Sequence, residues 1–413
     1  MPLMATIGSS VTQALEHVNK AAQADISGTG QAHFDLIESI RKLTLAVEKP
    51  NETLTRCRLE VGSANPSPLS ETPLRNAAVR MALEAGLLQA IGDNKDSSIT
   101  AEALSKATNT DALLIVRIMR LVTYVGYCDE VGEDEYAANE VTHLFNTPAM
   151  LGGERHHYDL FFPIGAVLPQ YVRETGVHQF PTRPEDKSPF FYAHNVQFWE
   201  FFDKYPEHRK DFDEYLSKRR KGLNQWHQMF PMAETLGPDA ERDPDAVLFV
   251  DVAGSKGHEA MSLREAHPDL PGRLILQDIS SVIDKISKDP PEGVELMPYD
   301  FFTPQPIKGA RVYYFRNICH DWSDEHCQRF LSNTAKSMKK GYSRLLIDDY
   351  VLPNKGASLR GPAMDFLMLM YASGIERTMR QWERVLEASG LDIVKVWGVD
   401  SGHEQIIECQ LKA

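Results

Sequence analysis

Three aspartates follow three predicted β-strands in succession, and carboxylates at such positions can bind the hydroxyl and amino groups of a small ligand. Asp251 lies near the end of the apolar run Val247–Val252, Asp278 comes directly after the next predicted strand, and Asp300 follows Met297-Pro298-Tyr299 at the end of the third. Asp278 can accept hydrogen bonds from two neighbouring ribose hydroxyls, because a carboxylate has two acceptor oxygens. Asp300 could pair with an adenine amino group while Phe301 stacks on the ring.

A small-residue turn follows Asp251 and carries glycine at Gly254 and Gly257. A strand, a tight turn and a helix in this order form the junction at which α/β proteins bind nucleotide-like ligands. NAD usually requires G-x-G-x-x-G, and Ala253 and Ser255 occupy the flanking positions here. S-adenosylmethionine has no phosphate, so its looser requirement is met more easily; NAD stays the competing ligand.

Strands and helices alternate from Asp245 onward, which predicts a mostly parallel sheet with helices on both faces. The last two predicted strands, Leu391–Val396 and Glu404–Gln410, are joined by a short polar loop and should pair antiparallel. A reversed last strand is more typical of methyltransferase folds than of NAD-binding ones. The other predicted strands are Val247–Val252, Arg273–Gln277, Val294–Pro298, Arg311–Phe315 and Arg344–Asp348.

The most specific segment of the chain runs from Tyr314 to Glu325 and reads YFRNICHDWSDE. Together with LIDDYVLP at 346–353 and SGIERT at 373–378, it resembles the S-adenosylmethionine-dependent O-methyltransferases of the caffeic-acid and flavonoid type, in particular their fungal branch. The resemblance extends from about Pro73 to the end of the chain. It implies a Rossmann-like class I methyltransferase domain preceded by a helical, winged-helix-like dimerisation domain.

The resemblance also implies roles for individual residues. The catalytic base would be His320, flanked by the acids Asp349 and Glu376. S-adenosylmethionine would be bound by Asp251, Gly254, Gly257, Asp278, Asp300, Phe301 and the backbone around Arg316. The sequence departs from the family at two places: the turn usually reads Gly-Gly-Gly where this chain has Ala253-Gly254-Ser255, and the first flanking acid is usually Glu where Asp349 stands.

Methyl transfer from a sulfonium is an in-line displacement, so positioning of the acceptor oxygen is the main task. A phenol titrates near 10 and a free imidazole near 6.5, a gap of roughly 5 kcal/mol for complete proton transfer. His320 therefore helps most if a carboxylate holds the imidazolium as it forms, and Glu376 is the expected partner. In the competing interpretation His320 caps the following helix, a task that Asp321 or Ser323 could also perform.

The N-terminal region, residues 1–150, reads as helices followed by an acidic hairpin near Tyr127–Tyr136, a winged-helix-like pattern. Thr72-Pro73 should open a helix from Leu74 to Ile91, and Thr100 and Asp111 should cap the next two helices. DNA binding is disfavoured, because the last of these helices carries just two basic residues, Arg117 and Arg120, among apolar ones, and the hairpin is acidic. We therefore expect this region to form a homodimer.

Residues 151–240 are helical and rich in aromatic side chains, which suits the wall of a pocket for a flat acceptor. Residues 241–413 then form the S-adenosylmethionine-binding domain. Met368 and Tyr371, between the motifs of Asp349 and Glu376, are candidate substrate contacts.

Composition limits the classes of function. The 413 residues carry a net charge of −14, which argues against general nucleic-acid binding. The five cysteines are scattered without a C-x-x-C pair, and the histidines lack metal-ligand spacing, so no metal is expected. No apolar run approaches a membrane span, and we expect a cytoplasmic protein.

We therefore expect an O-methyltransferase acting on a phenolic or enolic hydroxyl of a small aromatic or polyketide-type natural product. Two alternatives stay open. Some fungal proteins of this family work as pericyclases that use the bound sulfonium as a positive charge. A non-catalytic winged-helix regulator would instead bind DNA with a steep salt dependence.

Overall fold

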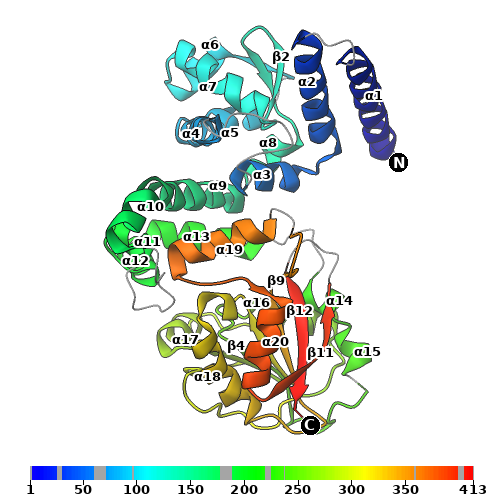
Figure 1. Cartoon of the computed structure of the whole chain (residues 1–413), viewed down its shortest axis with the longest axis vertical. Helices are drawn as coiled ribbons and strands as arrows, with labels where there is room; N and C mark the ends of the chain where they lie inside the picture. Colours follow the sequence, from blue (N-terminus) through cyan, green and yellow to red (C-terminus); the bar gives the residue numbers. More distant parts are fainter. Residues whose placement is uncertain are drawn as a thin grey trace. The chain divides into compact units, whose positions relative to one another are not determined.

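The computed structural model describes residues 2–25, 30–59, 71–94, 97–176, 188–218, 225–236, 238–357, 360–398 and 404–412 (Figure 1). The chain forms two compact units. The first comprises Met1–Phe162 and Pro206–Leu216, and the second comprises Pro163–Tyr205 and Ser217–Ala413. Residues 151–240, expected as a separate segment, are thus shared between the two units.

The first unit is mainly helical. Its elements are α1 (Pro2–Asp25), α2 (Gly30–Val47), α3 (Pro50–Leu59), α4 (Glu71–Glu84), α5 (Leu87–Asp93), β1 (Ile99–Thr100), α6 (Ala101–Thr108), α7 (Ala112–Tyr124), β2 (Asp129–Gly132), β3 (Glu135–Ala137), α8 (Glu140–Phe145), α9 (Pro148–Arg155), the π-helix η1 (His156–Phe161) and most of α13 (Pro206–Lys218). The predicted hairpin is β2 and β3, and β1 pairs antiparallel with β3.

The two helix N-termini of this unit that were predicted from capping side chains are observed. Thr100 accepts from the amide of Ala103, and Asp111 accepts from the amide of Leu114, so both predicted caps are confirmed. The single helix predicted for Leu74–Ile91 is wrong, because Gly86 adopts a left-handed conformation (φ 68°) and separates α4 from α5. Apolar spacing continues across that break, so periodicity alone does not reveal it.

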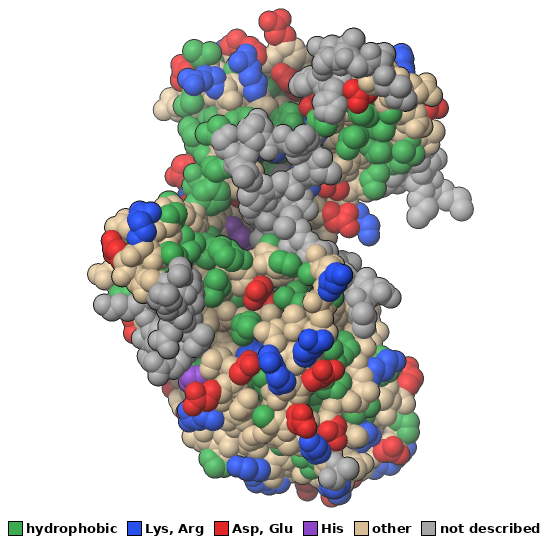
Figure 2. Space-filling view, in the orientation of Figure 1, with side chains coloured by type: hydrophobic (Ala, Val, Ile, Leu, Met, Phe, Trp, Pro, Cys, Tyr) green, Lys and Arg blue, Asp and Glu red, His purple; other side chains and the backbone are tan. Residues whose placement is uncertain are grey.

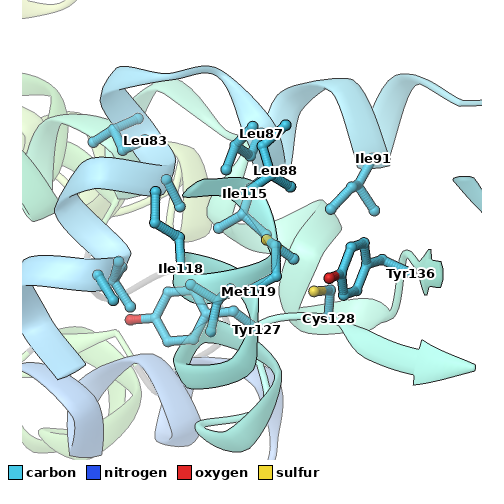
Figure 3. Packing of buried hydrophobic residues seen from close by; sticks show 14 of the residues in the cluster. Leu83, Leu87, Leu88, Ile91, Ile115, Ile118, Met119, Tyr127, Cys128 and Tyr136 are labelled. Carbon is cyan, nitrogen blue, oxygen red and sulfur yellow. The ribbon is translucent and has the colours of Figure 1, made fainter. Parts of the chain in front are cut away.

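Apolar side chains from these helices meet in one core (Figure 3). Leu87, Leu88 and Ile91 of α5 pack with Ile115 and Met119 of α7, and all five side chains are buried. The side chains of Tyr127, Cys128 and Tyr136 join the same core from the hairpin region. Helix α7 is therefore fixed by its apolar face.

The second unit contains a seven-stranded sheet with helices around it (Figure 1). Its strands are β4 (Val247–Val252), β5 (Arg273–Asp278), β6 (Val294–Pro298), β7 (Val312–Arg316), β8 (Arg344–Asp349), β11 (Leu391–Trp397) and β12 (Gln405–Leu411), in the order β11-β12-β8-β7-β4-β5-β6. Six strands run in one direction and β12 runs in the opposite one, because β12 pairs antiparallel with both β8 and β11. The predicted Rossmann-like sheet with its reversed last strand is confirmed.

The other elements of this unit are helical, apart from the short strands β9 (Val351–Leu352) and β10 (Arg377–Thr378). They are α10 (Phe162–Thr175), α11 (Pro189–His194), α12 (Phe198–Lys204), α14 (Trp226–Met229), α15 (Met232–Thr235), α16 (His258–Ala266), α17 (Ser280–Ile286), the 3₁₀ turn η2 (Cys319–Asp321), α18 (Asp324–Ala335), α19 (Arg360–Ala372) and α20 (Met379–Ala388).

Alternate residues of β7 face opposite sides of the sheet, as a strand buried on both faces requires. Val312 and Tyr314 belong to one apolar cluster, and Tyr313 and Phe315 belong to the other. On the face visible in Figure 2, Lys and Arg are interspersed with Asp and Glu over this unit. None of the helices described is both long and apolar enough to span a membrane.

Candidate active site

Parallel strands β4, β5, β7 and β8 are adjacent, so the residues at their carboxyl ends meet at one edge of the sheet. Asp251 lies opposite Leu276 of β5 and Tyr314 of β7, and Arg316 lies opposite Asp348 of β8. The topology therefore gathers at this edge the strand-end residues singled out in the sequence.

The turn after β4 is strained at two non-glycine positions. Ala253 (φ 59°) and Ser255 (φ 49°) both adopt the left-handed conformation, as does Gly257 (φ 73°). The backbone thus takes a path that favours glycine without having glycine at 253 and 255. Gly254 itself is obligatory, because a Cβ there would lie 2.3–2.6 Å from the carboxyl atoms of Asp251.

Asp251 is a buried carboxyl with spare acceptor capacity. Its side chain is almost inaccessible, and Oδ2 has no hydrogen-bond partner among the described residues. Burial raises the pKa of Asp251 to about 7, although the positive charge of Arg316 acts in the opposite direction. Such an acceptor is costly to bury unless something donates to it.

Asp278 supports the turn from the neighbouring strand. Its Oδ2 accepts from the amide of Ser255 at 2.9 Å, and its Oδ1 accepts from the amide of Ile279 at 2.8 Å. These two bonds orient the carboxylate of Asp278 at the end of β5.

The residue before Asp278 takes part in a closed pair of amides. The buried side chains of Gln277 and Gln305 hydrogen-bond each other twice, at 2.8 Å in both directions. This pair joins the end of β5 to the loop after β6, which also carries Asp300 and Phe301.

Asp300 and Phe301 both lie on that loop, but they differ in how far their side chains are buried. Asp300 is exposed, and its Oδ1 accepts from the amide of Phe302 at 2.9 Å. Phe301 is half-buried, with its ring centroid 4.8 Å from that of Phe330 and 5.8 Å from that of Trp322. The ring of Phe301 is thus positioned by contacts with other aromatic side chains.

Arg316 contributes its side chain to the sheet edge as well as its backbone. The guanidinium forms an ion pair with Glu259 of α16, and its Nε lies 3.7 Å from Oδ2 of Asp348. Sequence reasoning missed Glu259, which follows Gly257 by two residues and is placed by the helix that the turn begins.

His320 lies in the turn η2 directly after β7 and is buried. Its Nδ1 is 2.8 Å from Oε1 of Glu376, and its Nε2 is 3.7 Å from Oδ1 of Asp321. The helix-cap interpretation of His320 is wrong, because the side chain of Ser323 caps α18 by accepting from the amide of His326.

The carboxylates around His320 control its charge. Burial acts to lower the pKa of His320, but Glu376 and Asp321, with a smaller effect of Asp349, outweigh burial and raise that pKa to about 10. Burial raises the pKa of Asp321 to about 6. Sequence reasoning considered Asp321 only as a helix cap, and its position beside His320 was the available signal.

Asp349 differs from Glu376 in its surroundings. It is fully buried at the end of β8, and neither carboxyl oxygen has a hydrogen-bond partner among the residues described. Burial raises the pKa of Asp349 well above its ordinary value, which favours the protonated, neutral form. The shorter side chain of Asp therefore does not reproduce the contact that Glu376 makes.

Met368 and Tyr371 lie on α19, next to the turn that carries His320. The hydroxyl of Tyr371 is 3.1 Å from Sδ of Met368, and the ring of Tyr371 lies 4.3 Å from that of Phe198, centroid to centroid. Met368 is buried and Tyr371 half-buried.

The described residues contain no cluster of three or more side chains suited to a metal ion.

The chain is similar to known O-methyltransferases. Residues 182–392 match the model of the O-methyltransferase domain family. The methyltransferase cfoC of Aspergillus candidus is 32% identical over 98% of both chains, and the demethylsterigmatocystin 6-O-methyltransferase of Aspergillus flavus is 30% identical over 82% of this chain and 86% of its own.

Two solved structures share the fold over almost the whole chain. OxaC in complex with SAH and oxaline has a TM-score of 0.73 at 29% identity, covering 98% of this chain and all of its own. A pericyclic reaction enzyme has a TM-score of 0.76 at 25% identity, covering 99% of this chain and 100% of its own. The chain matches the O-methyltransferase domain family and is 32% identical to cfoC over 98% of its length, so it belongs to the S-adenosylmethionine-dependent O-methyltransferases.

Proposed function

We propose that this enzyme methylates a phenolic or enolic hydroxyl of a small aromatic or polyketide-type natural product, with His320 as the general base. The observation that carries the proposal is the buried contact of 2.8 Å between Nδ1 of His320 and Glu376. A base whose second nitrogen is fixed by a carboxylate is oriented to take a proton at Nε2. Relatives support the substrate class by their names, which include a demethylsterigmatocystin 6-O-methyltransferase.

The residues at the sheet edge fit S-adenosylmethionine. The absence of a Cβ at Gly254 leaves room for the carboxyl of Asp251, and Oδ2 of Asp251 is a buried acceptor without a partner in the described part of the chain. We assign the methionine end of the cofactor to Asp251, Gly254 and Gly257. Its ribose would be held by Asp278, and its adenine by Asp300, Phe301 and the backbone around Arg316.

When bound, the cofactor supplies an electrophilic methyl group on a sulfonium. His320 Nε2 takes the proton of the acceptor hydroxyl as the oxygen–methyl bond forms, and Glu376 stabilises the resulting imidazolium at Nδ1. The proton that the hydroxyl loses would be held at Nε2 of His320 while Glu376 stabilises the imidazolium. Met368 and Tyr371 are proposed to contact the acceptor.

The raised pKa of His320 makes this proton transfer easier than the sequence suggested. A phenol titrates near 10, and the pKa of His320 is about 10, so the two groups are matched and the gap of roughly 5 kcal/mol for a free imidazole closes. The same shift leaves most of the histidine protonated at neutral pH. Activity should therefore rise with pH as His320 loses its proton.

Mass spectrometry of products would test the proposal. The purified enzyme would be incubated with S-adenosylmethionine and a panel of polyphenols, and a product heavier by one methyl group is expected. His320→Ala is the control and should abolish methylation while S-adenosylhomocysteine still binds. Unchanged turnover in that variant would overturn the assignment of the base.

A pericyclic reaction is the second candidate, because the pericyclic reaction enzyme shares the fold with a TM-score of 0.76. The same experiment separates the two functions. A product of unchanged mass but altered retention time supports isomerisation, whereas a gain of one methyl group supports transfer. The buried pair of His320 and Glu376 favours transfer.

Homodimerisation through the first unit is a further part of the proposal. Leu74 and Met81 of α4 and Leu113 of α7 are large apolar side chains that this unit exposes. Light scattering of the purified enzyme should give twice the mass of one chain. The mass of a single chain at micromolar concentration would contradict it.

A further inference from the structure

Arg377 is a fully buried cation that the proposed chemistry does not use. It lies in β10, which pairs parallel with β9 directly after β8. Burial of a guanidinium is costly unless its N–H groups are satisfied and its charge is compensated. The contacts that compensate Arg377 therefore indicate what it does.

The guanidinium of Arg377 bonds to both sides of the turn that carries His320. One terminal nitrogen donates to the carbonyl of Cys319 at 2.8 Å, and the other donates to the carbonyl of Trp322 at 2.7 Å. Nε donates to Oδ1 of Asp324 at 2.8 Å, at the start of α18. One side chain thus spans the 3₁₀ turn from its first residue to the helix beyond it.

The fork geometry of arginine suits this task. The guanidinium is planar and presents five donors in fixed directions, whereas the ammonium of lysine is a single point of charge. The ring of Trp382 lies 5.3 Å from the central guanidinium carbon and covers it. The next residue, Thr378, caps α20 by accepting from the amide of Gln381, which fixes the chain on the other side of Arg377.

The backbone just before Arg377 grips the same turn. The amide of Ile375 donates to the carbonyl of His320 at 2.8 Å. Gly374 approaches that carbonyl so closely that a Cβ would lie 2.2 Å from its oxygen. Residues 374–377 therefore hold the ring of His320 through Glu376, its carbonyl through Ile375 and its neighbours through Arg377.

We propose that Arg377 is a positioning residue for methyl transfer, which fixes the turn Cys319–Trp322 so that the imidazole of His320 stays within hydrogen-bond distance of Glu376. The proposal rests on the proposed role of His320 as the base. Replacing the guanidinium of Arg377 with the ammonium of lysine should keep the positive charge but release the turn Cys319–Trp322. A displacement of about 1 Å at a reacting group can lower the rate about a hundredfold.

Arg377→Lys is the test, and Arg311→Lys is a matched control. Arg311 is also buried, donates to the carbonyls of Leu236 and Tyr342, and lies over the ring of Tyr342 at 4.7 Å. It precedes β7, at the opposite end of that strand from His320. Both variants lose a buried guanidinium, so both should lose stability.

Hydrogen exchange at the imidazole C2 position, followed by mass spectrometry, reports the titration of His320 without any acceptor substrate. Glu376, Asp321 and Asp349 are the ionisable groups that face this ring. In Arg377→Lys the exchange midpoint of His320 should fall by at least about one pH unit as the contact with Glu376 loosens. Amide exchange in 317–323 should quicken, and Arg311→Lys should change neither.

Turnover completes the test. Arg377→Lys should lower kcat at least about tenfold, with the dissociation constant of S-adenosylhomocysteine within about twofold of wild type. An unchanged His320 midpoint, or a shift equal to that of Arg311→Lys, would overturn the positioning role. Full turnover in His320→Ala would instead overturn the proposed function, so the two failures are distinguishable.

Discussion

Glu376 and Asp349 are expected to contribute unequally to catalysis, although both are acids beside His320. Glu376 lies 2.8 Å from Nδ1, whereas Asp349 has no hydrogen-bond partner among the described residues. The pKa of His320 rises from 6.5 to about 10, which corresponds to about 5 kcal/mol in favour of the imidazolium. Among the charged groups Glu376 has the largest effect on this pKa, and a hydrogen bond to a charged group contributes about 1.5–3 kcal/mol.

Two isosteric substitutions test this inequality. Glu376→Gln should lower kcat about a hundredfold, because the imidazolium loses its charged partner as it forms. Asp349→Asn replaces a group that favours its neutral form with another neutral group, so kcat should stay within about threefold. Both rates would be measured as transfer of a radiolabelled methyl group to the acceptor found in the product screen.

The pH dependence gives a second measurement on the same variants. The raised pKa of His320 should fall toward 6.5 in Glu376→Gln, so the rising limb of kcat should move to lower pH. Asp349→Asn should move it less. Equal losses of kcat in the two variants, or a limb that stays in place in Glu376→Gln, would refute the assignment of Glu376 as the orienting acid.

Three further predictions follow from the same geometry. His320→Asn should bind S-adenosylhomocysteine within about twofold of wild type by calorimetry, since none of the proposed cofactor contacts is removed; a large loss would place His320 in the cofactor site instead. Ser255→Gly should raise the unfolding free energy by about 0.5–1 kcal/mol, because glycine adopts the left-handed conformation without strain. The control Ala266→Gly, at the exposed end of α16, should lower the unfolding free energy. A loss of stability in Ser255→Gly on thermal unfolding would contradict the strain at Ser255. Asp251 has a pKa raised from 3.8 to about 7, so its contribution to stability is complete below pH 4 and is lost as pH rises through 7. Asp251→Asn should flatten the fall in melting temperature between pH 5 and 8, and an unchanged slope would show that Asp251 titrates normally.

The strands of the sheet could be predicted closely because they are apolar runs bounded by turn signals. The predicted strands Val247–Val252 and Val294–Pro298 have the observed bounds, and Arg311–Phe315 is displaced by one residue. The helix break at Gly86 could not be predicted, since a left-handed glycine leaves the apolar spacing intact. Local pattern reveals elements better than it reveals a single backbone angle.

The site shows a similar division between local and non-local information. The contact of His320 with Glu376 joins residues 56 positions apart, and only the family motifs suggested it. The charge of the site could not be read from the sequence, because the pKa values of His320 and Asp349 depend on how deeply the fold buries them. The departure at Ser255 was visible as a residue type, but the left-handed angle that it adopts was not.

The closed amide pair of Gln277 and Gln305 limits how this enzyme can diverge. Each amide satisfies the other inside the sheet edge, so replacing one alone leaves a buried polar group unpaired at a cost of about 1–3 kcal/mol. Replacing both with apolar side chains would also remove the acceptor of the Ile307 amide, which donates to Oε1 of Gln305 at 3.1 Å. The single replacements and the joint apolar replacement therefore all lose hydrogen bonds, and sequences that diverge from this chain should keep both glutamines.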